Sequence, residues 1–94
     1  MTYIQEYNFL HITYYPKESA QITAFNNTLD KAKDWIHYLP NCWVIKTRKS
    51  TDEWYLRLKS VIGPTDNIFI VRIELSDRQG WLPKWVWEWF HKQK

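Results

Sequence analysis

The sequence contains very little cysteine and glycine, and these two shortages already exclude several classes of protein. One residue of the 94 is cysteine and two are glycine. Cys42 has no partner within the chain, so no intramolecular disulfide stabilises the fold. Gly63 and Gly80 do not form a glycine-rich phosphate loop. The cysteine and histidines lack the spacing of a zinc site, and the sequence indicates no metal and no cofactor.

Long hydrophobic runs are also missing. No stretch approaches the roughly 18 consecutive apolar residues of a transmembrane helix. The first residues, MTYIQEYNFLHITYY, lack the basic region and apolar run of a signal peptide. We therefore expect a cytoplasmic protein without a membrane partner, folded as a single domain over residues 1–94.

Aromatic residues, in contrast, are abundant, with seven Trp, six Tyr and four Phe. A chain this short buries only a modest core, so bulky side chains or a second copy must supply further stability. The aromatic residues concentrate in the closing segment GWLPKWVWEWFHKQK. We expect a dimer or partner interface there, made by Trp81, Trp85, Trp87, Trp89 and Phe90. The alternatives are a tail that fills the chain's own core and a stacking platform for a ligand.

Hydrophobic periodicity predicts six elements and a short final helix. Ser50 and Glu53 have capping-box spacing, and Pro40-Asn41 is a two-residue turn signal between two strand-forming segments. A helix that continues to Leu39 is the alternative to the first strand of that hairpin. The predicted elements are a strand at 7–14, a helix at about 19–34, strands at 35–39 and 42–47, a helix at 51–62, a strand at 67–75 and a helix at 83–91.

This order, β-α-β-β-α-β, predicts an α+β fold of the ferredoxin-like type. Such a fold has an antiparallel four-stranded sheet with two helices on one face, here followed by the tryptophan-rich short helix. The other sheet face stays bare and needs cover from the tail, a second chain or a ligand.

Three segments carry a resemblance to a known family: WIHYLPNCWVIKT, DNIFIVRIEL and GWLPKWVWEWF. Together they resemble the SinR-like bacterial and phage proteins, within the ferredoxin-like superfamily of CRISPR adaptor nucleases and VapD-type ribonucleases. The resemblance covers about residues 7–90. It implies a homodimer in which the bare sheet faces of two protomers pack together, with the C-terminal segment lying across the partner.

One departure from this family concerns its metal site. The nuclease members have an aspartate at the end of the first strand, whereas this chain has Tyr14-Tyr15 followed by Pro16. Magnesium binds through carboxylates and water, and a phenol does not replace that ligand. The resemblance therefore implies a member without the metal-binding aspartate.

Candidate ligand-binding residues lie at two strand ends. Lys46, Arg48 and Lys49 precede the capped helix, whose first N–H groups add to their attraction for phosphate. Tyr14 and Tyr15 are candidates for base stacking at what we expect to be the same rim of the sheet. The alternative for the three basic residues is a solvated strand end with no ligand. The alternative for the two tyrosines is that they are bulky residues at a strand end with no binding role.

His11 and His37 are weaker candidates, as an acid/base pair for metal-independent RNA cleavage. They lie on strands that the expected fold makes near neighbours, and the alternative is two half-buried structural histidines.

Three functions follow from these observations. The first is a dimeric, non-catalytic binding protein that takes RNA, DNA or a nucleotide. The second is a phage-encoded inhibitor that binds a host defence protein or a nucleotide, and the third is a small endoribonuclease.

We expect a homodimer, because a bare sheet face and an apolar tail need cover in so short a chain. Light scattering at micromolar concentration should give a mass near twice the 11.6 kDa of one chain. A monomer mass throughout a dilution series would contradict this expectation.

We also expect no magnesium- or manganese-dependent nuclease activity, because Tyr14 and Tyr15 offer no carboxylate. The measurement is incubation of labelled RNA and DNA with the protein, with each metal and with chelator. Metal-dependent cleavage that survives stringent purification would refute the expectation.

Overall fold

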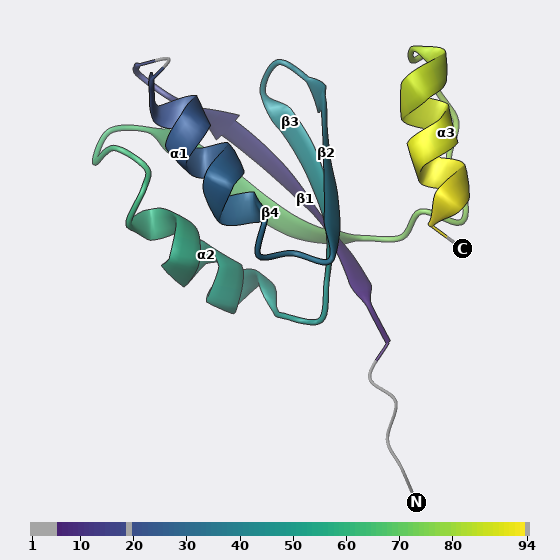
Figure 1. Cartoon of the computed structure of the whole chain (residues 1–94), viewed down its shortest axis with the longest axis horizontal. Coiled ribbons are helices and arrows are strands. Elements are labelled where there is room, and N and C mark those ends of the chain that lie inside the picture. The colour runs from purple at the N-terminus through teal and green to yellow at the C-terminus, as the bar shows by residue number, and fades with distance from the viewer. Residues whose placement is uncertain (1–5, 19, 94) are drawn as a thin grey trace, which may run out of the picture.

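The computed structural model describes residues 6–18 and 20–93 and has an α+β architecture (Figure 1). Four strands form one sheet, and three helices pack against it. The element order is β1 (Asn8–Tyr15), α1 (Ala20–Leu29), β2 (Asp34–Leu39), β3 (Cys42–Thr47), α2 (Thr51–Lys59), β4 (Asn67–Ile73) and α3 (Lys84–Lys92).

The sheet is antiparallel throughout and has the strand order β2-β3-β1-β4. β1 is a central strand, as its apolar residues on both faces indicate. Asn8 pairs with Thr47 at one end of β1, and Tyr15 pairs with Asn67 at the other. The turn at Pro40-Asn41 joins β2 to β3, as predicted.

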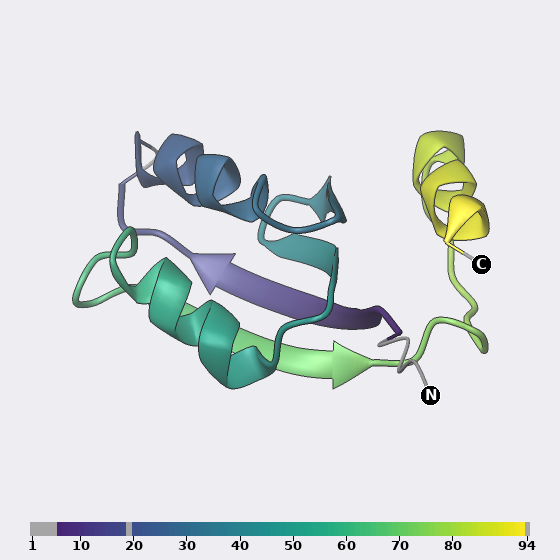
Figure 2. The same ribbon diagram turned by 60° about the horizontal axis from the view of Figure 1, so that its bottom comes forward.

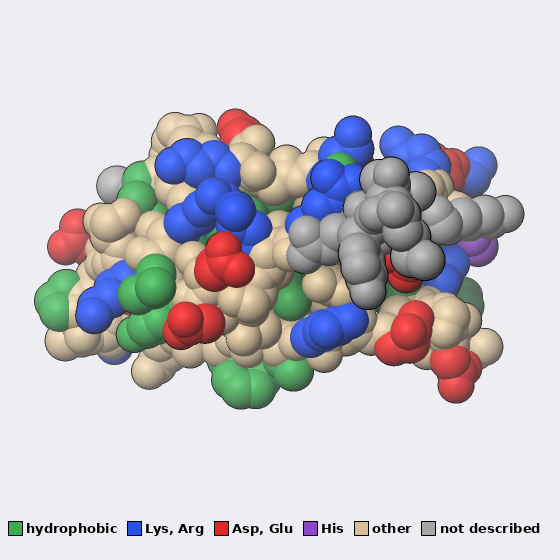
Figure 3. Space-filling model, turned by 90° about the horizontal axis from the view of Figure 1, so that it is seen from below, with side chains coloured by type: hydrophobic (Ala, Val, Ile, Leu, Met, Phe, Trp, Pro, Cys, Tyr) green, Lys and Arg blue, Asp and Glu red, His purple; other side chains and the backbone are tan. Residues whose placement is uncertain are grey.

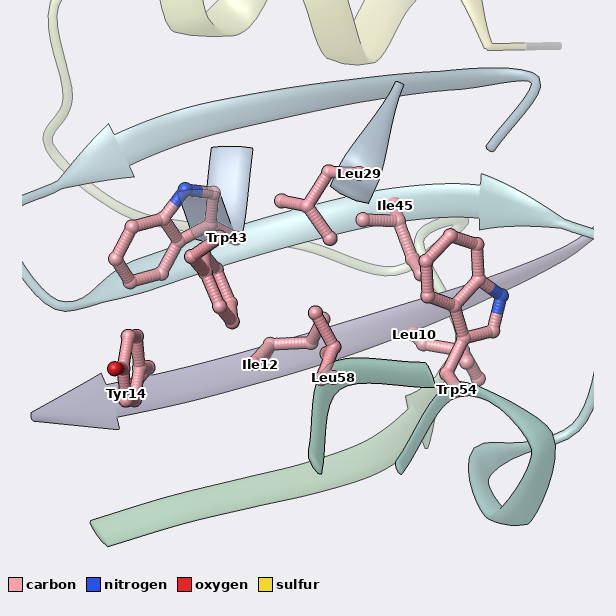
Figure 4. Packing of buried hydrophobic residues seen from close by; sticks show 9 residues of the cluster. Leu10, Ile12, Tyr14, Leu29, Trp43, Ile45, Trp54 and Leu58 are labelled. Carbon is pink, nitrogen blue, oxygen red and sulfur yellow. The ribbon is translucent and has the colours of Figure 1, made fainter. Parts of the chain in front are cut away.

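One face of the sheet carries the main core, which α1 and α2 cover. Alternate residues of β1 and β3 point toward these helices, among them Leu10, Ile12 and Trp43 (Figure 4). Leu58 and Trp54 of α2 meet them, and all five side chains are at most 1% exposed. Truncating a buried Trp to Ala typically costs about 3–5 kcal/mol, so these tryptophans stabilise the fold strongly.

The two core tryptophans also make buried polar contacts. The indole N–H of Trp43 donates to Asn26 Oδ1 at 2.9 Å, and that of Trp54 donates to Thr47 Oγ1 at 2.9 Å. Thr47 in turn accepts from the Lys49 N–H at 3.0 Å. These bonds satisfy donors that would otherwise be costly to bury. The Trp43 bond joins β3 to α1, and the Trp54 bond joins β3 to α2.

The second face is covered in part by α3, which stands on the opposite side of the sheet from α1 and α2 (Figure 2). Val86, Trp89 and Phe90 of α3 pack on Ile36 of β2 and Val44 of β3. Phe9 of β1 and Ile73 of β4 pack with the α3 cluster on this face. At the other end of β1 and β4, none of the described elements covers it. There Phe69 is 64% exposed and Val71 is 38% exposed.

Two predicted helices are too long, the strand predicted at 42–47 has the predicted bounds, and the other strands and the final helix differ by one or two residues at an end. The helix predicted at 19–34 ends at Leu29, and its expected N-cap, Ser19, lies outside the described residues. The N–H groups of Asp30, Lys31 and Ala32 instead donate to the carbonyl three residues earlier, as in a turn. The Lys33 N–H donates to Lys46 O of β3. Residues 30–33 form the connection that places β2 beside β3. The helix predicted at 51–62 ends at Lys59.

Asp66 joins three parts of the chain near the end of β1. Its carboxylate accepts from Tyr14 Oη at 2.7 Å, from the Gly63 N–H at 2.7 Å and from the Lys17 N–H at 2.9 Å. The Tyr14 hydrogen bond is the main cause that holds the pKa of Asp66 below its usual value, and the two backbone donors add to it. Asp66 therefore contributes stability above the ordinary aspartate pKa, and that contribution is lost as the pH falls through the lowered pKa.

Replacing Tyr14 with Phe removes the hydrogen bond that lowers the pKa of Asp66 most. The variant should therefore have a lower free energy of unfolding at neutral pH, and that free energy should fall less steeply as the pH is lowered. We expect a melting temperature about 4–8 °C lower at neutral pH and a shallower loss of stability on acidification. Thermal unfolding over a series of pH values measures both. Tyr55→Phe is the control, because the Tyr55 ring is 42% exposed on α2; acid profiles that coincide for wild type and Tyr14→Phe would contradict the prediction.

Candidate functional site

A hollow with many basic side chains lies where the start of β1, the α1–β2 loop and the β3–α2 loop meet. We call it the basic hollow; it has a volume of about 470 Å³. Lys and Arg side chains gather on this side of the molecule (Figure 3). The residues that line the hollow are Tyr7, Lys31, Ala32, Lys33, Thr47, Arg48, Lys49, Glu53 and Arg57.

Strand pairing and helix capping bring these residues together. The pairing of Asn8 with Thr47 places Tyr7 beside the end of β3. Ser50 caps α2 with the predicted capping box: its Oγ accepts from the Glu53 N–H at 3.2 Å, and its own N–H donates to Glu53 Oε1 at 3.4 Å. Arg57, one turn further along α2, lies over the Trp54 ring at 5.0 Å.

Tyr7 is the aromatic residue of this hollow. The Arg48 guanidinium lies 4.2 Å from the centre of its ring, and Lys46 Nζ lies 5.4 Å from it. Sequence reasoning missed Tyr7 because it assigned the stacking role to the other end of the strand. The available signal was the antiparallel register, which sets the first residues of β1 against the last residues of β3.

The charge in the hollow is strongly positive. Five cationic residues line it, and Glu53 is the one carboxylate among the lining residues. The Ser50 N–H is the main cause that holds the pKa of Glu53 below its usual value, and Glu53 pairs with Lys49 at 3.5 Å. Lys31 and Lys33 are exposed and have no ion pair among the described residues. Such a surface attracts phosphate groups.

The predicted cluster of Lys46, Arg48 and Lys49 does lie at one rim, but the predicted tyrosines lie elsewhere. Tyr14 is 0% exposed and stacks on Phe25 at 4.5 Å, so it belongs to the core. Tyr15 is 53% exposed and pairs with Asn67, at the far end of β1 from Thr47. The expectation of a shared rim is wrong because antiparallel strands end at opposite edges of a sheet.

His11 and His37 do not form a pair. β3 lies between their strands, and the two rings point to opposite faces of the sheet. His11 hydrogen-bonds to Tyr38 Oη, and burial lowers its pKa. His37 stacks on Trp43 with ring centres 4.0 Å apart.

The aromatic residues of the closing segment divide into two groups. Trp89 and Phe90 are each 8% exposed and pack within the chain's own second core, and Trp87 is half-buried beside them. Trp81 is 99% exposed and Trp85 is 53% exposed. Of the residues expected at an interface, only these two present most of their ring surface to solvent.

Within residues 6–18 and 20–93, no three His, Cys, Asp or Glu side chains lie together as a group that could hold a metal ion. The helices in the same part of the chain are all too short or too polar to span a membrane. Comparison with protein-family models, with curated proteins and with solved structures finds no match to this chain.

Proposed function

We propose that the protein is a non-catalytic binding protein that holds single-stranded nucleic acid or a nucleotide in the basic hollow. The observation that carries this proposal is the meeting of five cationic side chains and the Tyr7 ring around one hollow. Cations bind the phosphates, and an aromatic ring adjoining them offers a stacking surface for a base.

We also propose that the fold is ferredoxin-like and that the SinR-like resemblance reflects common descent. The element order β-α-β-β-α-β, with α1 and α2 on one face of an antiparallel sheet, supports the fold assignment. The family assignment rests on the three sequence segments alone.

Two features support a binding role over a catalytic one. The Asp66 carboxylate lies at the end of β1, and Tyr14, Lys17 and Gly63 donate hydrogen bonds to it. His11 is half-buried and bonded to Tyr38 on the face opposite His37, so the two histidines cannot act on one scissile bond.

A second copy of the chain is the cover that we propose for the open half of the second face. Phe69 and Val71 lie there in a row with Thr13 and His11 of β1, in the register Thr13↔Phe69 and His11↔Val71. Burying such apolar surface is worth roughly 25 cal/mol per Å², which favours association.

The test of the binding proposal is the affinity for labelled single-stranded RNA as a function of salt. Each phosphate contact should contribute about 0.7 to the slope of log affinity against log salt. The double variant Lys31→Gln with Lys33→Gln should flatten that slope, because both lysines line the hollow. Tyr7→Ala should lower the affinity about tenfold and leave the slope unchanged, because it removes stacking and no charge.

The matched control is Lys17→Gln with Lys59→Gln, which changes the net charge equally at positions outside the hollow. Its slope should stay close to that of the wild type. Equal slopes for both double variants would show that the attraction comes from net charge and would refute the site. Failure to bind RNA, DNA and a panel of nucleotides at low salt would refute the function.

A further inference from the structure

β4 lies at the margin of the sheet, with β1 on one side and no other described strand on the other (Figure 2). We call this unpaired side of the strand the β4 edge. A hollow of about 260 Å³ adjoins it, lined by residues 51, 52 and 55 of α2 and residues 68–70 of β4. An unpaired strand edge is a template for one more strand.

The hydrogen bonds of Tyr14 show which backbone groups of β1 point away from β4. Its N–H donates to Asn41 O at 3.0 Å, and its carbonyl accepts from Asn41 Nδ2 at 2.9 Å. Asn41 directly precedes β3, so both backbone groups of Tyr14 point toward β3. The direction alternates from residue to residue along a strand, so the backbone groups of Thr13 point toward β4.

The strand register carries this alternation across to β4. Thr13 pairs with Phe69, so the backbone groups of Phe69 form hydrogen bonds to β1. The N–H and C=O groups of Ile68, Ile70 and Arg72 therefore point the opposite way, out of the β4 edge. No described residue offers these groups a hydrogen-bond partner, so they are available to another chain.

The two edges of the sheet differ in their protection against a further strand. β2, at the other edge, has a register shift between His37 and Leu39, and Pro40 follows it directly. β4 pairs with β1 without a shift, and its first five residues, NIFIV, contain no charge and no proline. Bulges, charges and prolines are the features that keep edge strands from pairing. The β4 edge has none of them before Arg72.

Exposed apolar side chains flank the β4 edge on both faces of the sheet. Phe69 and Val71 are exposed on the open face, and Tyr55 of α2 is exposed on the other face, beside the hollow. Large apolar side chains that gather on a surface mark an interaction site. The unpaired backbone of β4 thus lies between two apolar flanks.

We propose that the β4 edge pairs antiparallel with the β4 edge of a second copy of the chain, so that the two sheets form one continuous sheet. This contact holds the second copy that is proposed above for the open face, and it depends on that copy. The main-chain hydrogen bonds come from the outward groups of Ile68, Ile70 and Arg72.

The charges of β4 favour pairing with itself in this direction. A two-fold axis near Ile70 sets the uncharged centre of one strand against the same residues of the other. Arg72 is the one charged residue of β4, and antiparallel pairing places its two copies at opposite ends of the contact. A parallel pairing would bring them together. Phe69 and Val71 of the two copies then lie side by side on the open face, where such cross-strand pairs stabilise a sheet.

Amide hydrogen exchange of the full chain, followed by NMR, locates the contact. Light scattering first finds one protein concentration at which the chain is dimeric and a lower one at which it is monomeric. The amides of Ile68, Ile70 and Arg72 should exchange about tenfold more slowly in the dimer. The Phe69 amide is the internal control, because its bond to β1 is present in both states.

Arg72→Pro and Arg72→Gln form a matched pair of variants. Both remove the charge, and only proline removes the N–H from the β4 edge. Arg72→Pro should raise the dissociation constant of the dimer about tenfold, whereas Arg72→Gln should change it by less than about twofold. An edge strand accepts proline where the N–H has no partner within the chain. Circular dichroism checks the fold, and the exchange experiment on the wild type decides if Arg72→Pro does not fold.

Two kinds of result would overturn the proposal, and they differ in what they leave standing. A dimer whose Ile70 amide gains no protection, or equal dimerisation of Arg72→Pro and Arg72→Gln, would refute the β4 contact and assign the second copy to another surface. A monomer at every concentration would refute the second copy itself, and the β4 contact with it.

Discussion

The pairing of β1 with two antiparallel neighbours is the constraint on which the rest of the molecule depends. Because β1 runs antiparallel to β3, its first residues lie beside the last residues of β3. This places Tyr7 with Arg48 and creates the basic hollow. The same pairing carries Tyr15 to the opposite rim, beside the start of β4. A parallel pairing would have exchanged these neighbours, so the composition of the hollow follows from strand direction.

Core packing then holds the hollow in shape. Thr47 ends β3, and its hydroxyl accepts from the Trp54 indole and from the Lys49 N–H. α2 is therefore tied to β3 at the point where the basic side chains begin, and the capping box at Ser50 fixes the direction in which α2 leaves. A binding surface built on such fixed elements loses less conformational entropy when a ligand orders it. The loop lysines at 31 and 33 are the adaptable part of the same surface.

Local signals in the sequence predict local structure well and distant neighbours poorly. The capping box at Ser50, the turn at Pro40-Asn41 and the alternation along β1 each depend on a few adjacent residues, and the structure has all three. The burial of Tyr14 depends on Asp66, 52 positions away, and on Phe25 of α1. No pattern within the first strand contains that information. Tyr7 was missed for the same reason, because its role depends on the β1–β3 register.

Buried tryptophans help this short chain, which has no intramolecular disulfide, to fill both sides of its sheet. They differ in whether the indole N–H has a hydrogen-bond acceptor. Trp43 and Trp54 are fully buried, and each indole N–H donates to a side-chain oxygen of the chain. Those two tryptophans therefore act within the core. Trp89 is almost as deeply buried, yet its N–H has no acceptor among the described residues, and its ring borders an open groove. A buried aromatic with an unsatisfied donor at the edge of a hollow is poorly explained by packing alone. The hydrogen bonds of the chain thus distinguish Trp43 and Trp54, whose indole N–H groups have an acceptor, from Trp89, which packs in the second core with its N–H unsatisfied among the described residues.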